Sequence, residues 1–377
     1  MKTIIYFGHH KVGSTALQSF LFQNQEALMR HGLLYPATES EGLSYALARL
    51  VLGSGPAARA GQFAELQKSP VPMNAREPHN ALAFQMLAQA NGGKAPKWHG
   101  GLPGVVQMIR TIRQQAKFLQ PEAVLLCSEV MANFGPQHPG LIDRVRDIFP
   151  NSDHVLYCVL RRPDDYLVSW HAQRLRFGDK VKALSGGAAL GYAGSIHFNY
   201  RKVVEPWVRV FPDAPLHLRN YTDVLAAGGS VEDFLDRTGL AVPRGLETGV
   251  RANSSLPRSA MEIARRGNHD LPPDQAQALR QHLLDLRPEQ LPVPNRDVEM
   301  FGAELRAQMA ERFAPVHAYL SELTGQPAFF PDIEEMTRPR PVPEAEAVAA
   351  LLDRLPVQGL PGPLAAYIDS LRRDYAA

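Results

Sequence analysis

Short apolar stretches alternate along the chain with longer segments in which apolar residues recur every three or four positions. The apolar stretches predict buried strands at residues 3–7, 123–127, 154–160 and 216–218. The longer segments predict helices at residues 17–28, 105–119, 140–149, 164–177 and 200–211. Strands and helices that alternate in this way form a parallel sheet covered by helices on both faces. We therefore predict an α/β fold.

Two long segments interrupt the alternation. Residues 37–103 carry helical patterns only at 43–52 and 80–90, among glycines and prolines, and residues 184–198 are rich in glycine. Long irregular segments in α/β proteins often cover a binding site. We therefore expect 37–103 and 184–198 to be insertions that form a variable acceptor region and lid.

The last third of the chain has a helical pattern. Its longest helical run is 298–323, and the proline-rich run 338–343 predicts a stiff linker before two helices at 344–355 and 363–375. We expect residues 1–330 to form one domain, and residues 331–377 to be a linker with a helical extension.

Composition narrows the class of protein. The 377 residues are 45% hydrophobic and 21% charged, which is typical of a globular protein with a sizeable core. With 40 basic and 38 acidic residues the net charge is +2, which excludes a strongly basic nucleic-acid-binding surface. No apolar run is long enough for a transmembrane helix or a signal peptide, so we expect a cytoplasmic protein. The sequence leaves the oligomeric state open.

The two cysteines, Cys127 and Cys158, both lie in predicted strands. Neither belongs to a metal-binding spacing or a disulfide framework. We therefore expect a protein without a metal.

The strongest chemical signal lies between the first strand and the first helix, in the segment Gly8-His9-His10-Lys11-Val12-Gly13-Ser14-Thr15. Such a turn points backbone N–H groups and the positive end of the helix dipole at one spot, where a phosphate or sulfate binds. The segment nearly matches the nucleotide-triphosphatase loop G-x-x-x-x-G-K-[ST], but Ser14 stands where that loop has lysine, and Lys11 lies inside the loop. The alternative is a glycine turn that only joins strand to helix.

A second signal follows the strand at 154–160, where Arg161 and Arg162 leave the sheet and Ser169 lies about two turns into the next helix. Ligands of open α/β sheets bind at the carboxyl ends of the strands. An arginine with a nearby hydroxyl suits a second, separate phosphate. We choose Arg161 for it, with Arg162 as the alternative. The other interpretation is that an arginine pairs with one of the two aspartates after Pro163.

Together the two segments resemble the paired signatures of the sulfotransferase superfamily that uses 3′-phosphoadenosine 5′-phosphosulfate (PAPS). The first is similar to the family's 5′-phosphosulfate loop in the version G-x-x-K-x-G-[ST]-[ST], followed by Leu17-Gln18. The second is similar to its 3′-phosphate segment, R-x-P with a serine six residues after the proline, here Arg161, Pro163 and Ser169.

Further residues resemble the bacterial, carbohydrate-type branch of that superfamily: Asn24, Leu28, Gly32, Tyr35-Pro36, Ser128-Glu129, Phe211, Tyr221 and Asp233-Phe234-Leu235. The resemblance covers roughly residues 1–36 and 120–260, about half of the chain. The basic R-K-G motif of the cytosolic small-molecule branch is missing, and Arg265-Arg266-Gly267 is only a loose analogue.

The resemblance implies a P-loop-type parallel sheet, with PAPS as the donor of a sulfuryl group and a hydroxyl of a carbohydrate, glycoconjugate or other small molecule as the acceptor. It assigns Lys11 to the leaving 5′-phosphate oxygens and Gly13, Ser14 and Thr15 to the phosphosulfate. No metal is required if lysine and loop carry the charge. The acceptor hydroxyl needs a base.

For that base the first candidate is Glu129, which follows the strand at 123–127. His10 is the next candidate, before His9 and His79. The alternative role for Glu129 is a structural carboxylate that holds backbone N–H groups or Lys11.

Two other functions stay open. A P-loop kinase or nucleotide triphosphatase is disfavoured by Ser14 and by the lack of an acidic magnesium site, of which 125–129 is the nearest imitation. A non-catalytic nucleotide-binding protein with the same fold is disfavoured because Lys11, Arg161 and Ser169 are all present.

Overall fold

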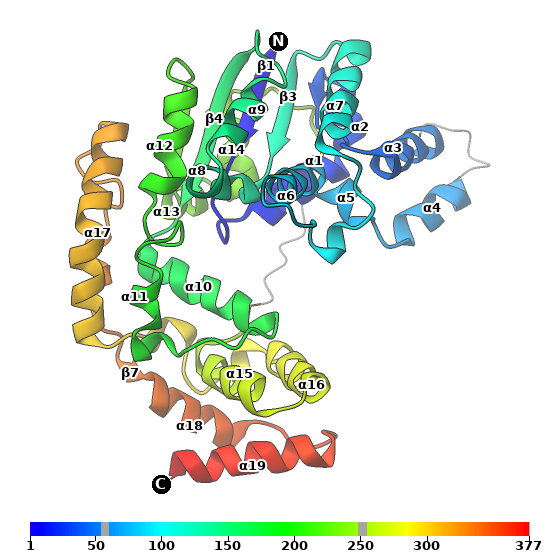
Figure 1. Cartoon of the computed structure of the whole chain (residues 1–377). Coiled ribbons are helices and arrows are strands. Elements are labelled where there is room, and N and C mark those ends of the chain that lie inside the picture. The colour runs from blue at the N-terminus through cyan, green and yellow to red at the C-terminus, as the bar shows by residue number, and fades with distance from the viewer. Residues whose placement is uncertain (54–59, 248–254, 377) are drawn as a thin grey trace. The chain divides into compact units, whose positions relative to one another are not determined.

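A computed structural model describes residues 1–53, 60–247 and 255–376, and it divides the chain into two compact units (Figure 1). A sheet unit comprises Met1–Arg161 and Tyr200–Ala252. A helical unit comprises Arg162–Asn199 and Asn253–Ala377. These boundaries differ from the predicted domain at 1–330 with its extension at 331–377, which stays a prediction.

Among the described residues, the sheet unit contains five parallel strands, four of which the sequence predicts. They are β1 (Lys2–Tyr6), β2 (Leu33–Leu34), β3 (Ala123–Cys127), β4 (Asp153–Leu160) and β5 (Leu216–Asn220). Their order is β2-β3-β1-β4-β5, with Tyr6 in register with both Cys127 and Tyr157. The chain therefore runs from β1 toward one edge of the sheet and later toward the other. The carboxyl end of β1 is thus a topological switch point, where open α/β sheets bind ligands.

Helices cover both faces of this sheet, which confirms the predicted α/β architecture. On one face Ile4, Tyr6 and Val159 pack in a buried cluster with Leu17 of α1 (Ser14–Gln23) and Phe234 of α14 (Ser230–Thr238). Successive residues of a strand point to opposite faces. Phe7, just past the end of β1, accordingly stacks on Trp207 of α12 (Arg201–Val210), with ring centroids 4.6 Å apart.

The sheet unit contains further helices besides α1, α12 and α14. Four of them form most of the predicted insertion 37–103: α3 (Ser40–Gly53), α4 (Ala60–Lys68), α5 (Met73–Arg76) and α6 (Pro78–Ala90). The others are α2 (Gln25–Arg30), α7 (Val105–Leu119), α8 (Phe134–Gln137), α9 (Gly140–Arg146) and α13 (Tyr221–Ala226). The predicted helix at 105–119 is confirmed at both ends.

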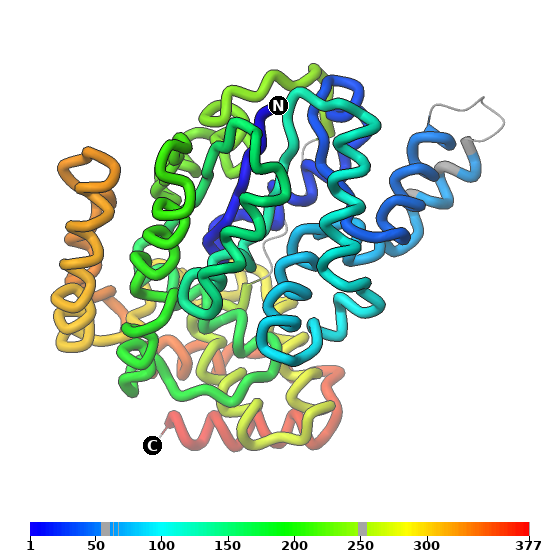
Figure 2. Tube along the Cα trace, turned by 45° about the horizontal axis from the view of Figure 1, so that its top comes forward, coloured from blue at the N-terminus to red at the C-terminus, as the bar shows by residue number. Residues whose placement is uncertain are grey.

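The helical unit consists of helices and a small sheet. Its helices are α10 (Pro163–Arg176), α11 (Ala189–Gly191), α15 (Arg258–Asp270), α16 (Pro273–Leu284), α17 (Ala303–Thr324), α18 (Glu344–Arg354) and α19 (Gly362–Ala376). Helix α15 packs against α10, α16 and α18, and Figure 2 shows the red C-terminal helices beside the yellow ones. Within the described part of the chain, no helix has the length and apolar character that a membrane crossing needs.

Two details of the helical unit differ from the sequence-based expectation. The helix predicted at 298–323 begins only at Ala303, because Val298–Glu299 is strand β6 and Gly302 adopts a φ of 84°. The run 338–343, predicted as a stiff linker, contains β7 (Val342–Pro343), which pairs in parallel with β6. The two C-terminal helices are therefore attached to the unit by sheet pairing as well as by helix packing.

Candidate functional site

The segment between β1 and α1 is fixed to the neighbouring strand. The N–H groups of Phe7 and His9 donate to the carbonyls of Tyr157 and Val159 in β4, at 3.2 and 2.9 Å, and Val159 N donates to Gly8 O at 3.1 Å. Beyond these bonds the backbone turns sharply. It does so through left-handed conformations, with φ 61° at Lys11 and 86° at Gly13. A lysine in this conformation is uncommon, and such residues cluster at functional sites.

Gly13 is required by sterics as well as by its backbone angle. Ser230, the first residue of α14, donates its Oγ to the carbonyl of Val12 at 3.1 Å. A Cβ at position 13 would lie 1.9 Å from that Oγ. The serine thus closes one side of the turn, and only glycine fits beside it. Sequence reasoning missed Ser230, which lies 218 residues from Val12.

The first turn of α1 presents free donors. The N–H groups of Ala16 and Leu17 donate back to Gly13 O at 3.0 and 3.3 Å, whereas those of Ser14 and Thr15 have no acceptor among the described residues. No side chain caps this helix, and its first turn holds no acidic residue. The positive end of the helix dipole is therefore left for an external anion.

Arg161 follows the last residue of β4 and is tied to the same loop region. Its carbonyl accepts a hydrogen bond from the Tyr200 hydroxyl at 2.6 Å, and the Tyr200 ring packs edge-on against His9 at 5.5 Å. The guanidinium lies over the Tyr221 ring, 5.4 Å from its centroid, a cation–π arrangement. Arg161 is thus held beside the switch point by contacts within the sheet unit.

Arg162, the alternative to Arg161, lies in the helical unit and is buried among carboxylates. It donates to both oxygens of Asp164, at 2.7 and 3.1 Å, and it pairs with Asp332. Burial alone would raise the pKa of Asp164, but the hydrogen bonds and charges of Arg162 and Arg306 hold it below its usual value. Arg162 therefore serves the fold of its own unit, as the second interpretation of this segment expected for one of the two arginines.

Ser169 lies on α10 of the helical unit, partly buried, while Arg161 belongs to the sheet unit. Their predicted partnership at one phosphate stays a prediction.

Glu129 lies just past β3, at the start of the short 3₁₀ helix η3 (Glu129–Asn133), and two side-chain amides hold it. Gln18 Nε2 donates to its Oε2 at 3.0 Å, and Asn80 Nδ2 donates to its Oε1 at 3.2 Å. Burial raises the pKa of Glu129 to about 7. The negative charge of Glu77 contributes to this rise, and the hydrogen bonds from its own backbone and the two amides oppose it.

The same contacts bring Glu129 beside helix α1, which begins at the turn after β1. Ser14 and Gln18 are four residues apart in α1, so they share a face and are separated by about 6 Å along the axis. At the other end of η3, Asn133 Nδ2 lies 3.5 Å from His10 Nε2. The loop, the first turns of α1 and the Glu129 carboxylate therefore form one neighbourhood.

The three histidines considered as bases differ in their surroundings. His9 is buried, and its Nδ1 accepts the N–H of His10 at 2.8 Å. His79 is fully buried, accepts the N–H of Cys127 at 3.2 Å and has its pKa lowered to about 3 by burial. It is therefore a neutral core residue. Of the three, only His10 is partly exposed.

Sequence reasoning did not connect three residues with Glu129, although it named Gln18 as part of the loop signature. Gln18 had a usable signal, because it lies one helical turn after Ser14. Glu77 and Asn80 had none: Glu77 precedes the predicted helical pattern at 80–90, and nothing in that pattern distinguishes the polar Asn80 at its start. No group of His, Cys, Asp and Glu side chains that could bind a metal ion occurs among the described residues.

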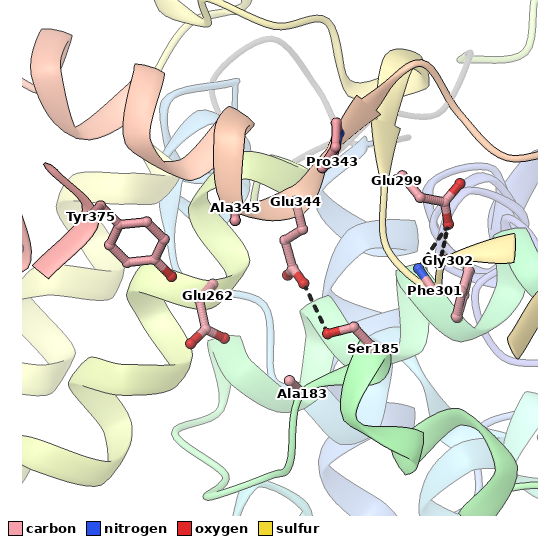
Figure 3. A pocket seen from close by; sticks show the side chains of 10 residues that line it. All are labelled: Ala183, Ser185, Glu262, Glu299, Phe301, Gly302, Pro343, Glu344, Ala345 and Tyr375. Atoms are coloured by element: carbon pink, nitrogen blue, oxygen red, sulfur yellow. Dashed lines mark hydrogen bonds between the residues drawn. The ribbon is translucent and has the colours of Figure 1, made fainter. Parts of the chain in front are cut away.

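A separate pocket of about 390 Å³ lies within the helical unit (Figure 3). Its charged lining residues are Glu262, Glu299 and Glu344. Arg265 pairs with Glu262 at 2.6 Å, and Arg306 pairs with Glu299 at 2.9 Å. Glu344 lies 3.4 Å from the Ser185 hydroxyl, and burial, with the charge of Glu262, raises its pKa to about 7. None of the residues that the sequence predicts for donor or base lines this pocket.

No family model matches the chain, and no curated protein matches it. One solved structure, a sulfotransferase from Alicyclobacillus acidocaldarius, matches over 89% of this chain and 98% of its own, with 13% sequence identity and a TM-score of 0.37. A match at that TM-score supports no conclusion about the activity of this chain.

Proposed function

We propose that the protein is a sulfotransferase that moves the sulfuryl group of PAPS to a hydroxyl group of a carbohydrate, glycoconjugate or other small molecule. The observation that carries the proposal is the turn after β1. It combines an uncapped helix start, a lysine inside the loop and a nearby carboxylate with a pKa of about 7. The choice of PAPS rests on the resemblance of the two sequence segments, and the choice of a carbohydrate-type acceptor rests on the further residues that resemble the carbohydrate-type branch.

The turn suits the 5′-phosphosulfate. The N–H groups of Ser14 and Thr15, with the two hydroxyls, would hold its oxygens, and Gly13 lets the backbone turn toward them. In sulfuryl transfer the acceptor oxygen forms a bond to sulfur while the bond from sulfur to the phosphate oxygen breaks. Lys11 would stabilise the negative charge that this leaving oxygen acquires, a form of electrostatic catalysis.

The acceptor hydroxyl loses its proton as it attacks, and Glu129 is the group we assign to take it. A general base works best when its pKa is close to the working pH, and about 7 meets that condition. Each carboxylate oxygen holds one amide donor, so acceptor capacity remains on Glu129 for the hydroxyl. His10 is the alternative base.

Arg161 is our proposal for the separate 3′-phosphate of PAPS. Its guanidinium lies at the carboxyl end of β4, and the carboxylates of the following segment are occupied by Arg162. Ser169 stays the sequence-based proposal for the hydroxyl that would assist it.

The experiment is a thermal-shift comparison of 3′-phosphoadenosine 5′-phosphate (PAP), ADP and ATP, the last with and without magnesium. PAP at about a hundred times its Kd should add ~2.7 kcal/mol of stability without magnesium, and ATP much less. Lys11→Ala should remove turnover of PAPS with a panel of acceptors while the melting temperature without ligand is retained. Lys117→Ala, at an exposed position of α7, is the matched control and should leave turnover unchanged. Strongest stabilisation by ATP with magnesium would instead make the protein a P-loop kinase or nucleotide triphosphatase.

A further inference from the structure

We infer that Asn80 is a positioning residue for the base: its single amide group holds the carboxylates of Glu129 and Glu77 next to each other and orients Glu129 toward the acceptor. The inference rests on the proposed function, and it adds residues that neither the sequence signatures nor the resemblance contains. It assigns a catalytic support role to helix α6 of the insertion, which carries Asn80.

All four hydrogen-bonding positions of the Asn80 amide are used. Nδ2 donates to Glu129 Oε1 at 3.2 Å and to Glu77 Oε2 at 3.0 Å. Oδ1 accepts from Ser128 Oγ at 2.7 Å and from Gln18 Nε2 at 3.2 Å. An amide offers two donor hydrogens and two acceptor lone pairs, so this group is saturated. Asn80 is also buried, which makes each lost bond costly.

The network fixes which way the amide points. The NH₂ group of Gln18 only donates, so it must meet Oδ1 of Asn80, and Nδ2 of Asn80 must then face the two carboxylates. Gln18 is itself anchored, because its Nε2 also lies 3.3 Å from the carbonyl of Cys127 at the end of β3. The orientation of the Glu129 carboxylate is therefore set by the sheet, by α1 and by α6 together.

Glu77 is the second carboxylate on this amide. Its other oxygen, Oε1, pairs with Arg76 at 2.8 Å. A negative charge one amide away favours the protonated form of Glu129. Asn80 thus both orients the base and keeps it close to a group that raises its proton affinity.

Other ionisable groups surround Glu129, but the nearest of them are uncharged at neutral pH. Burial raises the pKa of Tyr6, Tyr35 and Cys127 and lowers that of His79. The titratable or charged side chains on the loop and on α12, which packs against η3, are His9, His10, Lys11, Arg201, Lys202, Glu205 and Arg209. Removal of the Glu77 charge also leaves the Arg76 charge unpaired, and both changes favour the ionised form of Glu129, so their effects on its pKa have the same sign.

The test uses two variants that act on Glu129 in opposite directions. Glu77→Gln removes a negative charge, so Glu129 should lose its proton at lower pH. The acidic limb of the pH profile of kcat should therefore shift to lower pH. Asn80→Asp keeps the acceptor for Ser128 and Gln18 but replaces the donor by a carboxylate. The acidic limb should then shift to higher pH. In addition, kcat should fall about 10-fold to 100-fold while the KM for PAPS is unchanged. Asn91→Asp, at the exposed end of α6, is the matched control and should change neither.

A direct titration separates this inference from the proposed function. The Glu129 carboxyl signal in ¹³C-glutamate-labelled protein is assigned by its loss in Glu129→Gln, and its pKa is read with no reaction taking place. If wild-type protein does not turn over PAPS, the proposed function fails, but the shift of this signal in Glu77→Gln still decides the inference. A Glu129 titration that Glu77→Gln leaves unmoved in a folded protein overturns it. The titration of Glu129 in Glu77→Gln gives this decision even if Asn80→Asp does not fold.

Discussion

Substitution of Gly13 by alanine is a sharp test of the proposed anion-binding turn, because the structure separates two causes of strain there. Gly13 has a φ of 86°, a region that residues with a Cβ rarely adopt. An added Cβ would also lie 1.9 Å from Ser230 Oγ and 3.0 Å from Ser230 Cβ. The serine can rotate its hydroxyl away only by giving up its hydrogen bond to Val12 O.

The expected loss of stability follows from these two terms. A left-handed backbone costs an ordinary L-residue about 1–2 kcal/mol. The hydrogen bond that Ser230 gives up contributes about 1 kcal/mol. Gly13→Ala should therefore destabilise the sheet unit by about 2–3 kcal/mol, and it should weaken PAP binding because Ser14 and Thr15 follow the displaced residue.

The control for the backbone term is Gly239→Ala, at the end of α14. Gly239 has a φ of 64°, but an added Cβ there meets no atom within 4 Å. This variant should cost only the conformational term, about 1–2 kcal/mol. The measurement is urea unfolding, with hydrogen exchange in peptides from β1 and β4 as the readout. These peptides report the free energy of unfolding of the sheet unit.

The double variant Gly13→Ala with Ser230→Ala separates the steric term. In Gly13→Ala the serine hydrogen bond is already lost, so removal of the hydroxyl should cost nothing more. The sum of the single losses should then exceed the loss in the double variant by about 1 kcal/mol. The reasoning is refuted if Gly13→Ala costs no more than Gly239→Ala, or if the two single losses simply add.

Three further substitutions test other parts of the structure. Arg161→Ala should weaken PAP about 10-fold or more but adenosine 5′-phosphosulfate little, measured by calorimetry, because a charge-assisted bond to the 3′-phosphate contributes about 1.5–3 kcal/mol; equal weakening of both ligands contradicts this role. Arg162→Ala should instead destabilise the helical unit by about 3 kcal/mol in urea, because it leaves Asp164 buried without its bidentate partner; a neutral result contradicts it. Glu344→Gln should be neutral near pH 4 and stabilising at pH 8 in thermal shifts. The raised pKa, about 7 against 4.5, means that wild-type protein loses stability as pH rises through this range; a stability difference that does not change with pH contradicts it.

The strands and helices that the sequence predicts well are those with a strong local pattern. Strand β3 is buried at every position, and its bounds at 123–127 agree with the predicted ones. Strand β2 has only two residues, too few to show any period. Val298 in β6 pairs with Val342 in β7, and no local pattern marks a pairing between residues so far apart. For that reason the sequence alone predicts a linker at 338–343.

In the candidate site, too, the part that the sequence predicts is the part formed by neighbouring residues of the chain. The turn from Gly8 to Thr15 is contiguous, so its glycines, lysine and hydroxyls identify it without a structure. The residues that hold the Glu129 carboxylate are far apart in the sequence: Gln18 is 62 residues from Asn80 and 111 residues from Glu129. An asparagine or a glutamine is an ordinary surface residue in a sequence, and only burial and saturation of its hydrogen bonds mark it as part of a site.

Helix α1 connects the two halves of this site. In the proposed function its first residue, Ser14, would donate its N–H group to the phosphosulfate, and Gln18, one turn later, donates to the Glu129 carboxylate that we propose as the base. A shift of this helix would therefore change both the donor-binding groups and one of the two amide hydrogen bonds to the Glu129 carboxylate. The other support of the carboxylate comes from the insertion at 37–103, the region that we expect to contact the acceptor. Substitutions there that move α6 should consequently alter the base as well as the choice of acceptor, since Asn80 and Glu77 lie at the start of that helix.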